Sequence, residues 1–235
     1  MHVLIVGNGK MGTVLYNELV SESYSVSIIP DMSHFLGGTF DVVIDFSHPD
    51  GINDISNFCM RQKLPAVIAT TGYSDEQIDT IKNLSQKVPV IFSGNYSLGV
   101  ILMKRLVRET ARVLGAEFDI EIVDKHHHQK IDAPSGTAKM LIQAANEQLN
   151  HRVIYGRSGN QPRTEKEIAV HTIRGGSIVG EHEVIFAGAD EILSIKHEAL
   201  SKVIFAKGAI KAARWIVNQK PGLYNMEDLL FGGND

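Results

Sequence analysis

Apolar residues in the first part of the chain form short runs, and the stretches between them carry apolar residues at helical spacing. The runs are typical of strands buried on both faces: Met1–Val6, Val26–Ile29, Val42–Phe46, Ala66–Thr70 and Val90–Phe92. Helices are expected between them, around Ile52–Gln62 and Asp75–Ser85. This alternation predicts an α/β domain, a Rossmann-like parallel sheet with helices on both faces.

The pattern changes in the middle of the chain. A long helix is expected over Leu98–Leu114. Phe118, Ile120 and Ile122 then alternate with acidic residues, which predicts a strand with one buried face. Strand-like runs without long helices between them follow: Glu167–Arg174, Val179–Phe186 and Glu191–His197. These runs predict a second domain of the α+β class with a mixed or antiparallel sheet.

The last long helix is expected over Ser201–Asn218, where it returns to the first domain and makes that domain discontinuous. The predicted dinucleotide-binding domain therefore comprises residues 1–96 and 206–235. Residues 97–205 form the predicted substrate-binding and oligomerisation domain, and the two connections act as a hinge. The outer face of its sheet needs shielding, so a homo-oligomer is expected. Residues 155–166 lack periodicity and are expected to form a mobile loop.

A glycine-rich loop, Gly7-Asn8-Gly9-Lys10-Met11-Gly12, follows the first strand directly and opens a helix. Gly7 permits a tight turn, Gly9 lets the backbone approach a pyrophosphate, and Gly12 lets helix and strand pack closely. A structural turn of a βαβ unit is the alternative. The position of the loop after a buried strand favours binding of a dinucleotide.

The residue that selects between NADH and NADPH stays open. Asp31 follows the second strand, where an acidic side chain can bind the ribose hydroxyls of NAD. If Asp31 points away, Lys10 or another cation could accept a 2′-phosphate. An acidic turn residue without a ligand role is an equal alternative for Asp31.

Two later strand ends carry small and polar residues that can hydrogen-bond a ribose or a carboxamide. They are Ala69-Thr70-Thr71-Gly72 and Ser93-Gly94-Asn95-Tyr96. The end of an earlier strand, Asp45-Phe46-Ser47-His48-Pro49, offers groups of the same kind. In parallel sheets, ligands bind outside the carboxyl ends of the strands. Ordinary turn chemistry is the alternative for each strand end taken singly.

Residues 118–138 concentrate ionisable groups more than any other segment. The strand delivers His126, His127, His128 and Lys130 to its carboxyl end, and a turn then leads to a helix capped by Ser135. Imidazoles, an ammonium group and free helix N–H groups together suit a substrate that carries carboxylates and needs a proton. Solvated histidines are the first alternative.

A metal site is the second alternative, because imidazole is a common zinc ligand. Adjacent histidines on an extended segment point in different directions, and neither cysteines nor a helical histidine pair accompany them. No metal is therefore expected.

The overall composition limits the other function classes. The 235 residues carry a net charge of −4, which argues against nucleic acid or a membrane surface as partner. The single Cys59 excludes an internal disulfide. No leader or bilayer-length apolar run is visible, so a cytoplasmic protein is expected.

The segment from His126 to Ala138 resembles the H-H-x-x-K-x-D-x-P-S-G-T-A signature of the dihydrodipicolinate reductase family. Further landmarks match along the whole chain: Gly7–Gly12, Asp45-Phe46-Ser47, Ala69–Gly72, Asn95, Arg174-Gly175-Gly176 and Gly180-Glu181-His182. The resemblance implies hydride transfer from NADH or NADPH to a cyclic, unsaturated dicarboxylate on the diaminopimelate route to lysine. It also implies a homotetramer joined through the second-domain sheet.

Carried onto matching positions, the resemblance makes His126 the catalytic histidine and Lys130 the proton donor. It implies that His127, Gly136 and Thr137 bind the substrate. It also implies cofactor contacts on the glycine loop and the two strand ends: Gly7, Asn8, Gly9, Lys10, Met11, Gly12, Ala69, Thr70, Thr71, Ser93, Gly94, Asn95 and Tyr96. Ala69 stands where the family commonly has glycine, and Ser93-Gly94 replaces a more usual alanine pair.

Two other classes share parts of this pattern. An amino-acid or semialdehyde dehydrogenase with two domains would share the first third of the chain. A non-catalytic, cofactor-sensing regulator would keep the glycine loop. Neither class needs the cluster of histidines and lysine.

Overall fold

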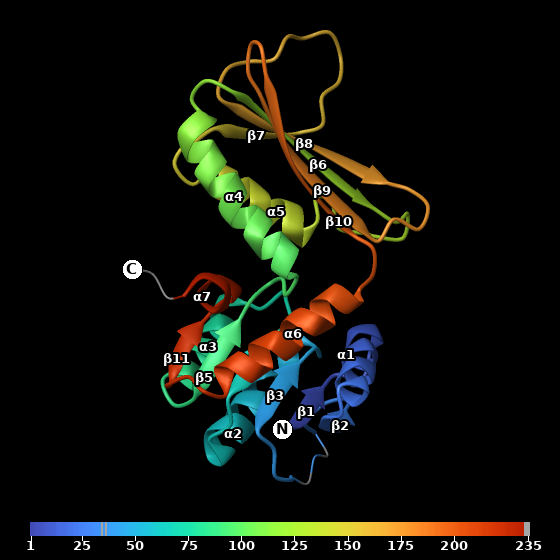
Figure 1. Ribbon diagram of the computed structural model, residues 1–235, viewed down its shortest axis with the longest axis vertical. Helices are drawn as coiled ribbons and strands as arrows, with labels where there is room; N and C mark the ends of the chain where they lie inside the picture. The colour runs from blue at the N-terminus through green and yellow to red at the C-terminus, as the bar shows by residue number, and fades with distance from the viewer. Residues whose placement is uncertain (34, 36, 233–235) are drawn as a thin grey trace. The chain divides into compact units, whose positions relative to one another are not determined.

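A computed structural model of the chain describes residues 1–33, 35 and 37–232. The chain divides into two compact units (Figure 1). Unit 1 comprises Met1–Leu98 and Lys202–Asp235, and unit 2 comprises Gly99–Ser201. Both ends of the chain thus contribute to unit 1, whereas unit 2 is a single stretch from the middle.

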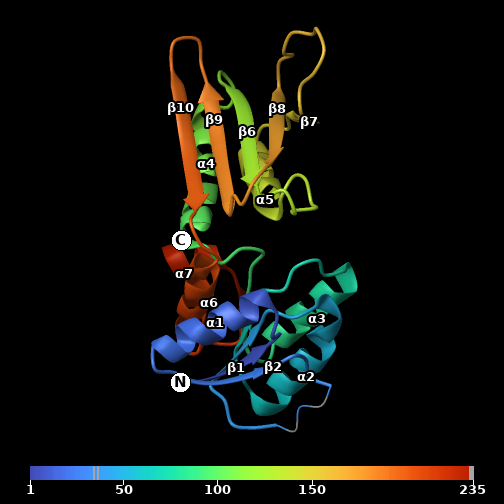
Figure 2. The same ribbon diagram turned by 90° about the vertical axis from the view of Figure 1, so that its right-hand side faces the viewer.

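Unit 1 is built on a six-stranded parallel sheet in the order β11-β5-β4-β3-β1-β2. Its strands are β1 (His2–Val6), β2 (Ser25–Ile29), β3 (Val42–Asp45), β4 (Ala66–Ile68), β5 (Pro89–Phe92) and β11 (Gly222–Tyr224). Its helices are α1 (Lys10–Ser21), α2 (Ile52–Gln62), α3 (Asp75–Ser85), α6 (Val203–Ile216) and α7 (Met226–Phe231), with a 3-10 turn at Pro49–Gly51. Helices α1 and α6 cover one face of the sheet, and α2 and α3 cover the other (Figure 2).

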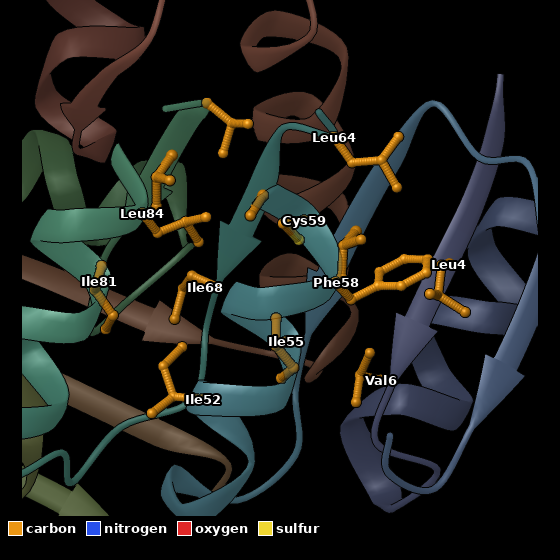
Figure 3. Close-up of a cluster of buried hydrophobic side chains, with 14 of the residues drawn as sticks. Leu4, Val6, Ile52, Ile55, Phe58, Cys59, Leu64, Ile68, Ile81 and Leu84 are labelled. Atoms are coloured by element: carbon orange, nitrogen blue, oxygen red, sulfur yellow. The ribbon is translucent and has the colours of Figure 1, made fainter. Parts of the chain in front are cut away.

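The main core of unit 1 packs apolar side chains of the sheet against α2 and α3 (Figure 3). Val6 and Ile68 from the sheet and Ile55, Phe58 and Leu84 from the helices are almost fully buried. Each such side chain stabilises the fold by about 1.5–3 kcal/mol. The core holds the strands in place, so their carboxyl ends present fixed loops to a ligand.

Unit 2 is built on a five-stranded mixed sheet in the order β10-β9-β6-β8-β7. Its strands are β6 (Asp119–His126), β7 (Arg152–Tyr155), β8 (Glu167–Arg174), β9 (Gly180–Ala187) and β10 (Ile192–Ala199). Strand β6 is central, runs parallel to β8 and runs antiparallel to β9. Helices α4 (Leu98–Leu114) and α5 (Gly136–Asn146) lie on one face of this sheet (Figures 1 and 2). Ile120 and Ile122 belong to the core between sheet and helices.

The predicted fold class, a Rossmann-like domain with a second α+β domain that holds a mixed sheet, is confirmed. The expected helices over Ile52–Gln62, Asp75–Ser85 and Leu98–Leu114 have these bounds in the structure. The strand predicted from Phe118, Ile120 and Ile122, which was expected to deliver the histidines to its carboxyl end, is β6, and it ends at His126.

The sequence analysis missed three short elements, which are β7, β11 and α7. Strands β7 and β11 are the edges of their sheets, and both are too short to show a period of their own. Among the described residues, no helix combines the length and the apolarity needed to cross a bilayer.

Candidate active site

A pocket of about 500 Å³ opens in unit 1 at the carboxyl ends of the parallel strands. The chain runs from β1 to β2 on one side and returns to β3 on the other, so the order of strands reverses between β1 and β3. Ligands of open α/β sheets bind at such reversal points. The pocket is lined by Gly7, Asn8, Gly9, Pro30, Asp31, Met32, Ser33, Phe46, Ser47, His48, Asp50, Gly51 and Asp54.

The backbone of the glycine loop forms one wall of this pocket. Gly7 has φ +106°, and a Cβ there would stand 2.3 Å from the carbonyl oxygen of Phe46. A Cβ on Gly12 would stand 1.8 Å from the carbonyl oxygen of Gly7, whereas a Cβ on Gly9 would meet nothing within 4 Å. Helix α1 begins after Gly9 without a side-chain cap, so its first N–H groups remain available to an anion. These residues fit a dinucleotide pyrophosphate.

The lining of the pocket includes three acidic side chains. They are Asp31, Asp50 and Asp54. The carboxylate of Asp31 accepts hydrogen bonds from the N–H group of Ser33, at 2.8 Å, and from the Ser33 hydroxyl. Asp31 is therefore a pocket residue with a fixed orientation.

The other predicted cofactor residues lie on α1 or at the ends of β4 and β5. Lys10, Met11 and Gly12 form the first turn of α1. Tyr96 is 2% exposed, and its hydroxyl lies 2.9 Å from the carbonyl oxygen of Ile68. The strand-end residues are not in the lining of the pocket described above: Ala69, Thr70, Thr71, Ser93, Gly94, Asn95 and Tyr96.

Hydrogen bonds within the loop that follows β5 fix the conformation of Ser93 and Asn95. The hydroxyl of Ser93 donates to the carbonyl oxygen of Asn95 at 2.7 Å, and the Asn95 side chain accepts from the Ser97 N–H group at 2.8 Å. Thr71 and Gly94 remain exposed. Exposed backbone and small side chains at the ends of β4 and β5 can hydrogen-bond a ligand.

Asp45 at the end of β3 was predicted to belong to a strand end that faces a ligand and was named as a family landmark, and the structure shows how its carboxylate supports the pocket. It is fully buried and accepts hydrogen bonds from the N–H group of Ser47 at 2.9 Å and from the Tyr73 hydroxyl at 2.9 Å. Burial, and then the charge of Asp45, raise the pKa of Tyr73 well above its usual value, so the phenol stays protonated. Asp45 thereby orients Ser47, which lines the pocket.

In unit 2 the candidate site is assembled around the carboxylate of Asp124. Ile120, Ile122, Asp124 and His126 share the inward face of β6, because side chains alternate along a strand. Asp124 is fully buried, and its Oδ1 lies 2.8 Å from Nδ1 of His126. A carboxylate in this position orients the imidazole that the sequence predicts to be catalytic.

Neighbouring strands bring two more groups to the same carboxylate. His182 on β9 stands directly opposite Asp124, and Arg174 on β8 stands directly opposite His126. Nε2 of His182 lies 3.3 Å from Oδ1, and a guanidinium nitrogen of Arg174 lies 3.1 Å from Oδ2. Arg174 also donates to the carbonyl oxygen of Asp132 at 2.6 Å.

The start of α5 completes the set of Asp124 partners. The N–H group of Ser135 donates to Oδ2 of Asp124 at 2.8 Å, while the Ser135 hydroxyl caps α5 by accepting from Ala138 at 3.1 Å. Gly136 is exposed and Thr137 is half-buried in the first turn. The N-terminus of a helix suits a carboxylate ligand, because its N–H groups and dipole favour an anion.

Burial by itself would raise the pKa of Asp124, but its four partners outweigh that effect. The contacts with His126 and His182, the Ser135 N–H group and the Arg174 guanidinium hold the pKa well below its usual range. Asp124 is therefore charged at neutral pH although it is buried.

Lys130 lies in the loop that follows β6, and its ammonium group is 2.7 Å from Oδ1 of Asp132. Partial burial raises the pKa of Asp132, but the hydrogen bond and charge of Lys130 lower it overall. The N–H group of Lys130 donates to the carbonyl oxygen of His127 at 3.1 Å, and His128 donates to Gly176 at 3.3 Å. The loop therefore presents an ammonium group on an ordered backbone.

Asp124, His126 and His182 also offer ligand atoms within 4.8 Å of one another, the type of group that can hold a metal ion. The same carboxylate already faces the guanidinium of Arg174, however, and a cation competes with a metal ion for it. The absence of a metal stays a prediction.

The sequence analysis did not assign roles to Asp124 or Ser135 in the chemistry, and it named Arg174 and His182 only as family landmarks. One signal was available for Asp124, because a carboxylate two residues before His126 must share its strand face. His182 and Arg174 could not be placed, because the cross-strand register is not visible in the sequence.

A glycine loop and pocket that fit a dinucleotide on a parallel sheet, with a cluster of imidazole, ammonium and guanidinium groups in a second unit, are typical of nicotinamide-dependent oxidoreductases. Comparisons with known proteins agree. Residues 17–96 match the family model for the N-terminus of dihydrodipicolinate reductase, and residues 99–230 match the model for its C-terminus. The chain belongs to the dihydrodipicolinate reductase family, as the sequence resemblance predicted, and it uses NADH or NADPH.

Individual relatives resemble the whole chain. The 4-hydroxy-tetrahydrodipicolinate reductase of Alkaliphilus oremlandii is 44% identical over 239 residues, which are 98% of each chain. That of Brachyspira hyodysenteriae is 42% identical over 232 residues, which are 98% of this chain and all of the relative. The solved structure of dipicolinate-bound dihydrodipicolinate reductase from Paenisporosarcina sp. TG-14 has a TM-score of 0.78 at 23% identity. It covers 98% of this chain and 99% of that one.

Proposed function

We propose that the chain reduces 4-hydroxy-tetrahydrodipicolinate to tetrahydrodipicolinate in the diaminopimelate route to lysine. The substrate gains a hydride and a proton and loses water. The observation that carries the proposal is the buried carboxylate of Asp124, which contacts two members of the family signature, His126 and the Ser135 cap at the start of α5. The relatives that match nearly the whole chain carry the name of this activity.

Unit 2 is the proposed substrate-binding unit. The ring carries two carboxylates, which need cations and N–H donors. Gly136 and Thr137 in the first turn of α5 bind one carboxylate through backbone N–H groups and the threonine hydroxyl. His127 contacts the substrate from the loop after β6.

Lys130 is the proposed proton donor, and His126 is the proposed catalytic histidine. Reduction leaves negative charge on the conjugated imine, and an ammonium group stabilises that charge and then protonates it. Asp132 holds the Lys130 ammonium at 2.7 Å before the substrate arrives. The bound nicotinamide supplies the hydride.

Unit 1 is the proposed cofactor-binding unit, and its pocket favours NADH. The glycine loop and the start of α1 bind the pyrophosphate, and Ala69, Thr70, Thr71 and the Ser93–Tyr96 loop contact the rest of the cofactor. Three aspartates line the pocket: Asp31, Asp50 and Asp54. An acidic lining accepts ribose hydroxyls as hydrogen-bond donors and repels a 2′-phosphate.

The chain works as a homotetramer in the cytoplasm. Helices α4 and α5 cover one face of the unit 2 sheet, so the opposite face is available to a second copy (Figure 2). Ion pairs such as Lys125 with Glu181, at 2.6 Å, lie on that face. Sedimentation equilibrium at micromolar concentration tests this assembly, and a monomer contradicts it.

A coupled assay tests the proposed reaction. Purified protein is mixed with NADH and substrate generated enzymatically in the cuvette, and the nicotinamide absorbance is followed. Loss of absorbance that requires the substrate-generating enzyme is the expected result. The rival dehydrogenases would instead respond to an amino acid or a semialdehyde. A regulator would bind NADH without oxidising it.

A further inference from the structure

The carboxylate of Asp124 joins groups that come from four different elements. His126 is on the same strand, β6, while His182 is on β9, Arg174 is on β8, and Ser135 caps α5. Asp124 itself is fully buried, so it cannot touch a ligand in solvent. It acts only through its partners.

The two oxygens of this carboxylate divide the partners into two pairs. Oδ1 faces the imidazoles of His126, at 2.8 Å, and His182, at 3.3 Å. Oδ2 accepts from the N–H group of Ser135, at 2.8 Å, and from Arg174, at 3.1 Å. One oxygen therefore orients the imidazoles, and the other fixes the start of α5.

The contact of Ser135 with His182 closes this network. The Ser135 hydroxyl lies 3.0 Å from Nε2 of His182, the same nitrogen that faces Oδ1 of Asp124. Rotation of either group would break a contact of the other.

The far edge of the His126 ring faces β9. A Cβ on Gly180 would stand 3.1 Å from Nε2 of His126, so a larger residue at this position would press against the ring. A carboxylate can only accept, so it selects the imidazole form with a proton on Nδ1. The ring is thus set in both orientation and tautomer.

We propose that Asp124 is the positioning residue of the active site, which couples the tautomer and orientation of His126 to the anion-binding start of α5. The inference rests on the proposed function and deepens it. Its content is that a buried carboxylate, which contacts no ligand, holds the imidazole and the carboxylate cradle in one fixed arrangement.

Replacement of Asp124 by Asn tests the proposal, because the amide keeps the shape and loses the charge. The matched control is Asp119→Asn on the same strand, since Asp119 also pairs with an arginine, Arg163, at 2.7 Å but is 56% exposed. We expect Asp124→Asn to lower kcat about 100-fold, the usual effect of misplacing reacting groups by about 1 Å. The control keeps wild-type kcat.

A conservative variant separates positioning from simple support of the fold. Asp124→Glu restores the charge at a slightly different place, and we expect it to recover at least about tenfold of the kcat lost in Asp124→Asn. The dissociation constant of NADH, measured by fluorescence, stays at the wild-type value in all folded variants because unit 1 is unchanged. A kcat for Asp124→Asn within about threefold of the Asp119→Asn control overturns the proposal.

A measurement on the wild-type protein keeps the proposal testable if Asp124→Asn does not fold. Histidine is labelled with ¹⁵N, and the His126 signal is assigned by its loss in His126→Gln. We expect the neutral ring to carry its proton on Nδ1, and a proton on Nε2 alone overturns the proposal. This measurement needs no substrate, so it remains decisive even if the wild type fails the reductase assay, a failure that would instead reject the proposed function.

Discussion

Backbone shapes the pocket of unit 1, whereas side chains shape the site of unit 2. In unit 1, Gly7 and Gly12 approach neighbouring carbonyl groups so closely that a Cβ would clash. In unit 2, a buried Asp124 gathers two imidazoles, a guanidinium group and a helix cap. The backbone pocket of unit 1 therefore suits a ligand of matching shape. The side chains of unit 2 instead set the protonation states and charge of their site.

The difference predicts different sensitivities. The backbone cradle should respond to added volume, because its walls cannot move without disturbing β1 and β3. The side-chain site should respond to loss of charge, because a buried ion without its partner is strongly destabilising. Substitutions in the two units therefore separate binding from chemistry.

The largest expected effect lies in unit 2. Lys130→Ala removes the proposed proton donor, and we expect kcat to fall by about 100-fold or more, with NADH affinity unchanged. Steady-state kinetics and NADH fluorescence measure the two quantities. Lys125→Ala is the control, because it removes a lysine of β6 that pairs with Glu181 of β9. Unchanged turnover of Lys130→Ala would reject the role.

In unit 1, two glycine substitutions distinguish stability from binding. Gly12→Ala forces a methyl group against the Gly7 carbonyl, and we expect a loss of about 1–3 kcal/mol in the free energy of unfolding. Gly9→Ala fills open space, so we expect stability within about 0.5 kcal/mol of wild type. NADH affinity should nevertheless fall by about tenfold, because the methyl group occupies the approach to the pyrophosphate. Urea unfolding measures the stability of each variant, and fluorescence titration measures its NADH affinity. Equal stabilities of Gly12→Ala and Gly9→Ala would contradict the packing argument.

The acidic lining gives a prediction on cofactor choice. Asp31→Ser removes one charge from the pocket, and we expect NADPH affinity to rise by about tenfold, equivalent to about 1.4 kcal/mol. NADH affinity should change less, because hydroxyl donors do not require a full charge. Dissociation constants for both cofactors are compared with those of Asp79→Asn, whose exposed carboxylate pairs with Lys82 on α3. An unchanged ratio of NADPH to NADH affinity would mean that the 2′ position of the cofactor does not lie near Asp31.

The smallest expected effect is the response of stability to acid. Asp124 has a folded pKa below its unfolded value, so the unfolded chain binds the proton first as the pH falls. The stabilisation is present above the unfolded pKa, near 4, and is lost as the pH falls toward the folded value. We expect urea unfolding between about pH 5 and pH 3.5 to show a shallower pH dependence for Asp124→Asn than for wild type. Parallel curves would mean that Asp124 is not charged in the fold.

Glu167 provides a second acid-sensitive group in unit 2. A hydrogen bond from Thr164, followed by those from Arg152 and Arg157, lowers the pKa of Glu167 to about 2. Its contribution is therefore also present above an ordinary glutamate pKa and lost below it. Glu167→Gln should remove a further part of the acid dependence, independently of Asp124.

The sequence alone determined the regular elements and the local chemistry. Alternating runs predicted the strands and helices of unit 1, because the periods of side-chain burial are 2 and 3.6 residues and act over near neighbours. The Gly7–Gly12 loop and the His126–Thr137 segment were recognisable because their residues are adjacent in the chain. The short edge strands β7 and β11 carried no such period.

The tertiary structure decided which distant residues meet. The register between β6 and its neighbours places His182 opposite Asp124 and Arg174 opposite His126. Register depends on the packing of a whole sheet against α4 and α5, and a shift of one residue would turn these side chains to the other face. The sequence therefore shows which groups are present, but only the packing of the sheet brings them to the carboxylate of Asp124.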